Sequence, residues 1–234
     1  MTEAEFISYL NNQGLNLSPD QLNKLKQYQI MLKEKNEVIN LTSIVEKEAV
    51  FEKHFLDSLL FSFHEDLAFK KCIDVGTGAG FPGLVLAICY PNIDMTLLEP
   101  LTKRCNFLSE VVQTLELKNV TIINERSEDF CKKHREEYDY AFARAVSRLN
   151  VLLEIITPLI KVDGYFVALK GKIYQEEINE STKAISKLNV IIDKVKECHL
   201  PSENDVRGNI FIKKISITPG MYPRNYAQIK KKPL

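Results

Sequence analysis

The chain has 234 residues and no net charge, and its 45 % hydrophobic and 26 % charged residues are ordinary for a globular protein with a large core. Its longest apolar stretches, such as residues 83–90, are too short to span a bilayer, and the acidic N-terminus lacks the apolar core of a signal peptide. Five scattered cysteines without a CxxC pair favour reduced thiols over a disulfide framework or a zinc site, so we expect a cytoplasmic protein without a bound metal.

The N-terminal part of the chain has the pattern of a helical region. Thr2 to Glu5 and Ser18 to Gln21 each fit a capping box, the second with proline at the first helical position. Apolar side chains then recur at helical spacing, at Leu22, Leu25, Tyr28 and Leu32. A further helix is expected over residues 46–63. We therefore predict that residues 1–66 form an N-terminal helical cap.

From Cys72 onward, short apolar strands alternate with helices. Strands are predicted at residues 72–75, 95–98, 120–123, 138–143 and 165–169, and two more at 189–196 and 208–217. Helices are predicted at residues 83–90, 103–115 and 149–160. The alternation indicates an α/β fold, a Rossmann-like parallel sheet with helices on both faces, over residues 67–220. Such sheets bind ligands at the carboxyl ends of their strands.

The end of the chain is basic. Residues 201–234 carry two acids and seven bases, a net charge of +5, whereas residues 1–60 carry a net charge of −3. A basic segment can bind a polyanion, or it can be a solvated, solubilising tail, and charge alone does not decide between the two. We treat residues 221–234 as a basic C-terminal tail.

The glycine-rich turn after the first predicted strand fits two cofactor classes. Asp74-x-Gly76-x-Gly78-x-Gly80 is the pattern of S-adenosylmethionine-dependent methyltransferases, while the last two of these glycines, with Gly83, also fit the dinucleotide fingerprint. A carboxylate at Asp74 can hold the turn and favour the cationic end of S-adenosylmethionine, and it would repel a pyrophosphate. Glu99, at the end of the second strand, can accept the ribose hydroxyls of either cofactor. A methyltransferase is favoured, and a nicotinamide-dependent oxidoreductase is the alternative.

Longer motifs are more specific. The chain resembles the bacterial ribosomal RNA small subunit methyltransferase G family, also called glucose-inhibited division protein B. The resemblance covers most of the chain. It rests on Asn40-Leu41-Thr42, His54 to Leu59, Asp74 to Gly83, Lys103-Arg104, Phe107-Leu108, Arg126-Ser127-Glu128, Arg144-Ala145-Val146, Lys170-Gly171 and Tyr222-Pro223-Arg224.

The resemblance implies methyl transfer from S-adenosylmethionine to N7 of one guanine in 16S ribosomal RNA, naked or in the small ribosomal subunit. The expected cofactor-binding residues, from the turn and from the matching motifs, are Gly76, Gly78, Phe81, Glu99, Ser127, Glu128 and Arg144. Where many relatives have aspartate the chain has Glu99, and Ser127 replaces a common alanine or valine. A protein that binds or assembles RNA without turnover is the non-enzymatic alternative, and a monomer is the expected state.

The implied chemistry needs few catalytic groups. N7 of guanine has a free lone pair and loses no proton on methylation, so we expect no catalytic base and no metal. Arg144 could hold the cofactor's carboxylate or an RNA phosphate, or form a structural salt bridge. Lys170 and Arg148 are weaker candidates for the RNA backbone.

Two further motifs invite a catalytic interpretation that packing explains better. His54 and Asp57 lie at helical spacing among apolar residues, so we predict a hydrogen-bonded structural pair. Cys105 follows two cations that could depress its pKa, but it lies within a predicted helix and we expect it to be buried.

Overall fold

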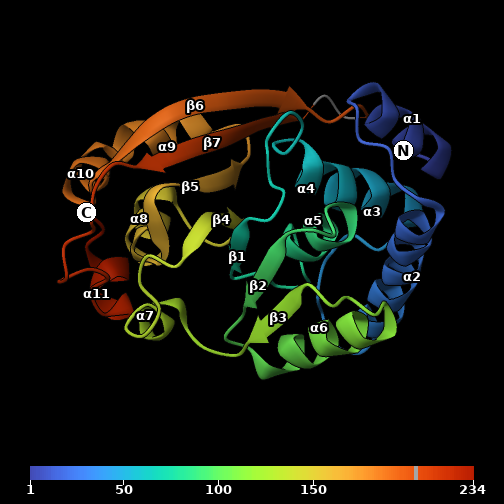
Figure 1. The fold of residues 1–234 in the computed structure, drawn as a ribbon, viewed down its shortest axis with the longest axis horizontal. Coiled ribbons are helices and arrows are strands. Elements are labelled where there is room, and N and C mark those ends of the chain that lie inside the picture. The colour runs from blue at the N-terminus through green and yellow to red at the C-terminus, as the bar shows by residue number, and fades with distance from the viewer. Residues whose placement is uncertain (203–204) are drawn as a thin grey trace.

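The computed structural model describes residues 1–202 and 205–234, and within them seven strands form one sheet with helices on both faces (Figure 1). The strand order is β3-β2-β1-β4-β5-β7-β6, and β7 runs antiparallel to both of its neighbours while the strands from β3 to β5 are parallel. The expected Rossmann-like α/β fold is confirmed. The strands are β1 (Lys71–Val75), β2 (Asp94–Leu98), β3 (Val120–Ile123), β4 (Tyr138–Arg144), β5 (Ile160–Lys170), β6 (Val190–His199) and β7 (Val206–Lys214).

Helices precede, connect and follow the strands. The N-terminal group is α1 (Glu3–Asn12), α2 (Pro19–Asn36), α3 (Lys47–Val50), the π-helix η1 (Phe51–Leu56) and α4 (Asp57–Leu59). The others are α5 (Gly83–Cys89), α6 (Thr102–Thr114), α7 (Ser127–Phe130), α8 (Leu149–Ile156), the 3-10 helix η2 (Thr157–Leu159), α9 (Tyr174–Glu180), α10 (Thr182–Lys187) and α11 (Tyr226–Lys231).

The sheet separates two hydrophobic cores, because successive residues of a strand point to opposite faces. Cys72 of β1 belongs to the core shared with α1, α2, α5 and α6, whereas the next residue, Ile73, belongs to the core shared with α8, α10 and α11. The N-terminal helices therefore pack against the same core as the sheet. The division of the chain at residues 66/67 and 220/221 stays a prediction.

The N-terminal helices begin where their capping residues predict. Thr2 and Ser18 form complete capping boxes with Glu5 and Gln21. The helix expected over residues 46–63 is present but changes register, because its centre is the π-helix η1. π-Turns of this kind are often found at functional sites, and η1 carries His54.

The C-terminal segment is ordered. It contains α11, whose Ile229 is fully buried, and Arg224 makes two hydrogen bonds of 2.7 and 2.6 Å to the buried carboxylate of Glu154 on α8. Among the residues described, no helix is both long enough and apolar enough to cross a membrane.

Candidate functional site

The carboxyl ends of β1, β2 and β4 meet at a cavity of about 490 Å³, which we call the glycine-turn cavity. Its position is the one expected for ligands of such a sheet, and its size suits a small-molecule cofactor. The residues that line it are Leu41, Thr42, His54, Gly76, Thr77, Gly78, Ala79, Phe81, Glu99, Pro100, Leu101, Arg104, Arg126, Arg144, Ala145 and Val146.

The turn needs glycine for two different reasons. Gly76 has a φ of +71°, and a Cβ there would lie 2.9 Å from the side chain of Val146. Gly78 has a φ of +63°, but a Cβ there would meet no atom closer than 4.0 Å, so a side chain would project into open space. Both lie in the left-handed region that disfavours most L-residues. The turn thus exposes backbone to the cavity, where a ligand can approach closely.

Asp74 holds the turn from behind. Its carboxylate is fully buried, and Oδ2 accepts hydrogen bonds from the Thr77 hydroxyl at 2.6 Å and the Gly83 amide at 2.8 Å. Burial raises the pKa of this carboxyl to about 6. Asp74 is not among the residues that line the cavity. The predicted role of Asp74 in holding the turn is confirmed. Because Asp74 does not line the cavity, it would influence the cationic end of S-adenosylmethionine only by fixing the conformation of the turn.

Glu99 connects the turn to the next strand. Its nearly buried carboxylate accepts hydrogen bonds from the backbone amides of Gly78 and Leu101, each at 3.0 Å, and lies 3.7 Å from the guanidinium of Arg104. Each carboxylate oxygen can accept a second hydrogen bond. Glu99, which stands where many relatives have aspartate, lines the cavity and has acceptor positions left on its carboxylate. Its contact with a ribose stays a prediction.

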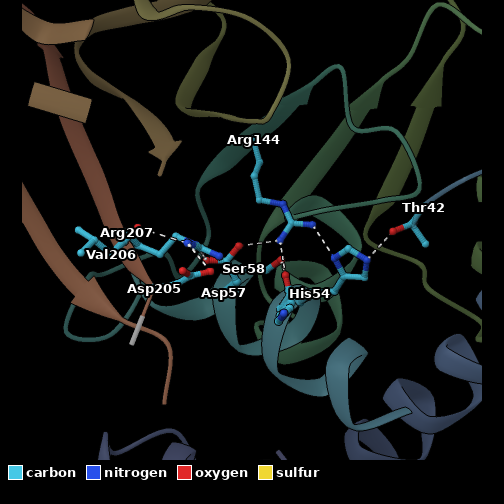
Figure 2. Close-up of polar contacts among 9 residues, drawn as sticks. Thr42, His54, Asp57, Ser58, Arg144, Asp205, Val206 and Arg207 are labelled. Carbon is cyan, nitrogen blue, oxygen red and sulfur yellow. Dashed lines mark hydrogen bonds and ion pairs between the residues drawn. The ribbon is translucent and has the colours of Figure 1, made fainter. Parts of the chain in front are cut away.

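Arg144, the last residue of β4, is the centre of a polar network (Figure 2). Its Nη1 donates to the carboxylate of Asp57 at 3.0 Å and to the carbonyl of Lys53 at 3.1 Å, and its Nη2 is 3.1 Å from Nδ1 of His54. Asp57 also accepts a hydrogen bond of 2.8 Å from Arg207 on β7. The network joins the N-terminal helices to two strands of the sheet.

The predicted direct pairing of His54 with Asp57 is wrong. No hydrogen bond joins them in the part of the chain that the structure describes, and the guanidinium of Arg144 lies between them. The register of η1 places the two side chains on opposite sides of that guanidinium.

Arg144 also fixes the protonation state of His54. A guanidinium can only donate, so Nδ1 of His54 accepts, and Nε2 carries the proton that it donates to Thr42 at 2.9 Å. Burial and the charge of Arg144 lower the pKa of His54 to about 3. The neutral ring stacks on Phe81, with centroids 4.3 Å apart and planes 15° apart.

Two expected cofactor residues lie away from the cavity lining. Ser127 and Glu128 begin α7, and the Ser127 hydroxyl donates to the carbonyl of Ile155 at 3.0 Å. Their neighbour Arg126 lines the cavity instead. The structure thus brings together Gly76, Gly78, Phe81, Glu99 and Arg144, whereas Ser127 and Glu128 follow Arg126 in the chain without lining the cavity.

A second cavity of about 710 Å³ adjoins the first, and we call it the strand-end cavity. His54, Arg144, Ala145 and Val146 line both cavities. Residues that follow β4 and β5 complete the second one, among them Arg148 and Lys170. Lys170 is 7 % exposed and 2.7 Å from Glu177, while Arg148 is paired with two glutamates of α9.

A cysteine, the potential metal ligands and two long-range contacts complete the description of the site. Cys105 is buried, as expected, and desolvation raises the pKa of its thiol. In residues 1–202 and 205–234, no cluster of three His, Cys, Asp or Glu side chains could hold a metal ion. Sequence reasoning missed Arg207 and the hydroxyl of Tyr28, because their partners lie 150 and 51 residues away along the chain.

Comparisons with known proteins agree with this geometry. A family model described as rRNA small subunit methyltransferase G matches residues 21–206. The chain is 43 % identical to ribosomal RNA small subunit methyltransferase G of Bacillus subtilis, over all of this chain and 99 % of that one. It is 42 % identical to the protein of the same name from Mycoplasma capricolum, over 95 % and 96 % of the two chains.

Solved structures share the fold at low identity. M. jannaschii TYW2 in complex with AdoMet is 14 % identical, with a TM-score of 0.58 over 74 % of this chain and 80 % of that one. A SAM-dependent methyltransferase from Aquifex aeolicus is 16 % identical, with a TM-score of 0.54 over 77 % and 97 %. These two likenesses show that the chain shares the fold of these proteins.

Proposed function

This chain belongs to the rRNA small subunit methyltransferase G family, and on that premise we propose that it transfers a methyl group from S-adenosylmethionine to N7 of a guanine in 16S ribosomal RNA. The observation that carries the proposal is the pair of adjoining cavities, one beside the glycine turn and one beyond Arg144. The comparisons favour neither the oxidoreductase nor the non-catalytic alternative.

The residues around the glycine-turn cavity fit S-adenosylmethionine. The backbone at Gly76 and Gly78 permits close approach, Glu99 offers acceptors to a ribose, and Phe81 supplies an apolar wall. Arg144 would attract the carboxylate of the amino-acid part. Ser127 and Glu128 are proposed to contact the adenosine end from α7. When bound, the cofactor supplies a methyl group on a positively charged sulfur, and the neutral thioether is a good leaving group when the methyl group is transferred.

The side chains at the wall between the cavities support an acceptor that loses no proton. Both ring nitrogens of His54 are occupied by Thr42 and Arg144, and both carboxylate oxygens of Asp57 accept from arginines. His54 is therefore not free to act as a general base, and the carboxylate of Asp57 is held by two arginines. N7 of guanine needs none, so positioning suffices for an in-line transfer.

We place the acceptor guanine in the strand-end cavity. It lies at the carboxyl ends of β4 and β5, and it shares the wall of His54, Arg144 and Val146 with the cofactor cavity. A purine there would lie beside the donor without displacing it. We also propose that the protein acts as a monomer in the cytoplasm.

The atom that accepts the methyl group can be tested directly. The protein would be incubated with methyl-labelled S-adenosylmethionine and either 16S ribosomal RNA or isolated small subunits, and modified guanines would be mapped. In a parallel transcript, 7-deazaguanosine replaces guanosine, so that N7 becomes a carbon without a lone pair. We expect methylation of guanosine RNA only. Equal labelling of the deaza transcript would exclude N7, and no labelling of either RNA would exclude the proposed reaction.

A further inference from the structure

A tyrosine of the N-terminal helices contacts the glycine turn from behind. Tyr28 of α2 is fully buried, and its hydroxyl donates a hydrogen bond of 2.5 Å to the carbonyl of Ala79. Ala79 lies between Gly78 and Gly80, both of which have positive φ values. The hydrogen bond therefore joins α2 to the part of the turn that lies between two glycines with left-handed backbone conformations.

The turn and the hydroxyl fit closely. Gly80 has a φ of +107°, and a Cβ at this position would lie 2.7 Å from the Tyr28 hydroxyl and 2.4 Å from a methyl group of Leu84. A glycine-rich turn has many accessible conformations. A buried carbonyl that loses its donor also becomes unsatisfied. The hydroxyl thus favours the one conformation of the turn in which the carbonyl of Ala79 points to α2 and residues 76–79 line the cavity.

The ring of Tyr28 supports the site in a second way. It stacks on Phe55 and on Phe81, with ring centroids 5.6 and 5.4 Å away, and these two rings also contact each other at 6.3 Å. Phe81 in turn stacks on His54. Tyr28 itself does not line the glycine-turn cavity, so it acts only through groups that do.

We propose that Tyr28 is a positioning residue for the cofactor, which fixes the carbonyl of Ala79 and the ring of Phe81 and so makes the N-terminal helices part of the cofactor site. The inference rests on the proposed function, because the ligand in question is S-adenosylmethionine. It goes beyond that function by assigning a role in cofactor affinity to a residue that the ligand does not touch.

The test is Tyr28→Phe, which keeps the stacked ring and removes only the hydroxyl. A hydrogen bond of this kind contributes a net effect that corresponds to roughly three- to tenfold in an equilibrium constant. We expect the Kd for S-adenosylmethionine by calorimetry and the KM for it to rise by about that factor. The kcat at saturating cofactor and the KM for RNA should stay near wild type.

Tyr138→Phe is the matched control. Tyr138 is also buried, and its hydroxyl donates to Thr96 at 3.3 Å, at the start of β4 and away from the turn. Its loss should lower the Tm without changing cofactor affinity. Amide exchange at Gly80, whose N–H bonds to the carbonyl of Thr77, should accelerate in Tyr28→Phe and not in Tyr138→Phe.

The outcomes separate the two proposals. If wild type binds S-adenosylmethionine and Tyr28→Phe binds it equally well, with only a lowered Tm, Tyr28 is merely structural and the inference fails. If the folded wild-type protein does not bind S-adenosylmethionine at all, the proposed function and this inference both fail.

Discussion

Residues 201–234 carry seven basic side chains, and three of these have no ion pair among the described residues. Replacing these three gives a quantitative test of RNA binding. The other four are paired with acids in the described chain: Arg207 with Asp57, Lys213 with Asp163, Lys214 with Glu136 and Arg224 with Glu154. Lys214 is completely buried. Lys230, Lys231 and Lys232, at the end of α11, are exposed and have no ion pair among the residues described. We propose that these three lysines contact RNA phosphates.

The size of the effect follows from counterion release. Each phosphate contact contributes roughly 0.7 to 0.9 to the slope of log affinity against log salt. Three contacts therefore contribute about two to three to the slope. Between 50 and 200 mM salt, that share alone weakens RNA binding by roughly 20- to 40-fold. Replacing Lys230, Lys231 and Lys232 by alanine should remove this share and leave cofactor affinity unchanged.

The assay is a salt titration of 16S ribosomal RNA binding for wild type and for the triple alanine variant. Alanine is a good helix former, so α11 should persist, and an unchanged Tm checks this. A matched control replaces Lys132, Lys161 and Lys213, three lysines that are each ion-paired, and should flatten the slope less. A wild-type slope in the Lys230–Lys232 variant would refute the reasoning and move the RNA surface to Arg126 or to the N-terminal helices.

Three further predictions concern the site. Gly78→Asp should raise the Kd for S-adenosylmethionine by roughly 100-fold, about 3 kcal/mol, while circular dichroism stays native. Gly78 lines the cavity and a Cβ there meets no atom closer than 4.0 Å, so the new carboxylate can enter the space of the ligand; unchanged calorimetric affinity would contradict this. The pKa of Asp74 is raised to about 6, so the folded protein binds this proton more tightly than the unfolded chain does. The resulting contribution to the free energy of unfolding, about 3 kcal/mol, is fully present below about pH 4 and is lost as pH rises through 6. Asp74→Asn should remove that pH dependence in denaturant titrations, and the same dependence in the variant would refute its assignment to Asp74. Single-turnover methylation should show no steep rise between pH 6 and 9, and a rise abolished by His54→Gln would favour an acceptor that loses a proton.

The sheet could be predicted because its signals are local. The strand from Cys72 to Val75, the glycine turn and the capping residues of α1 and α2 each occupy a few adjacent positions. The carboxyl-end rule then places Gly76, Glu99 and Arg144 at one edge without knowledge of the packing. The short helices α7, α9, α10 and α11 were not predicted, since segments of four to seven residues depend on tertiary contacts for their stability.

The partners of the charged residues could not be predicted, because sequence spacing does not show which ions meet. Arg207 and Lys214 counted toward the net charge of +5 in residues 201–234, yet each is held by an acid from a distant element. In the same way, helical spacing suggested that His54 and Asp57 pair directly. The intervening guanidinium of Arg144 comes from β4, some 90 residues later.

The ion pairs of Asp57 with Arg144 and Arg207 affect which acceptor atoms the site can use, because Arg144 lines both cavities. Separating a largely desolvated carboxylate from the two arginines that it pairs with costs free energy, because a buried charge would be left without a partner. Asp57 therefore holds Arg144 at the boundary of the two cavities, and we expect Arg144 to keep this position when a ligand binds. Arg144 in turn requires His54 to be a neutral acceptor, and the stack on Phe81 keeps that ring flat against the cofactor side. The wall consequently offers a fixed shape and few reactive groups, which suits an acceptor that already carries its lone pair and disfavours one that must first be deprotonated.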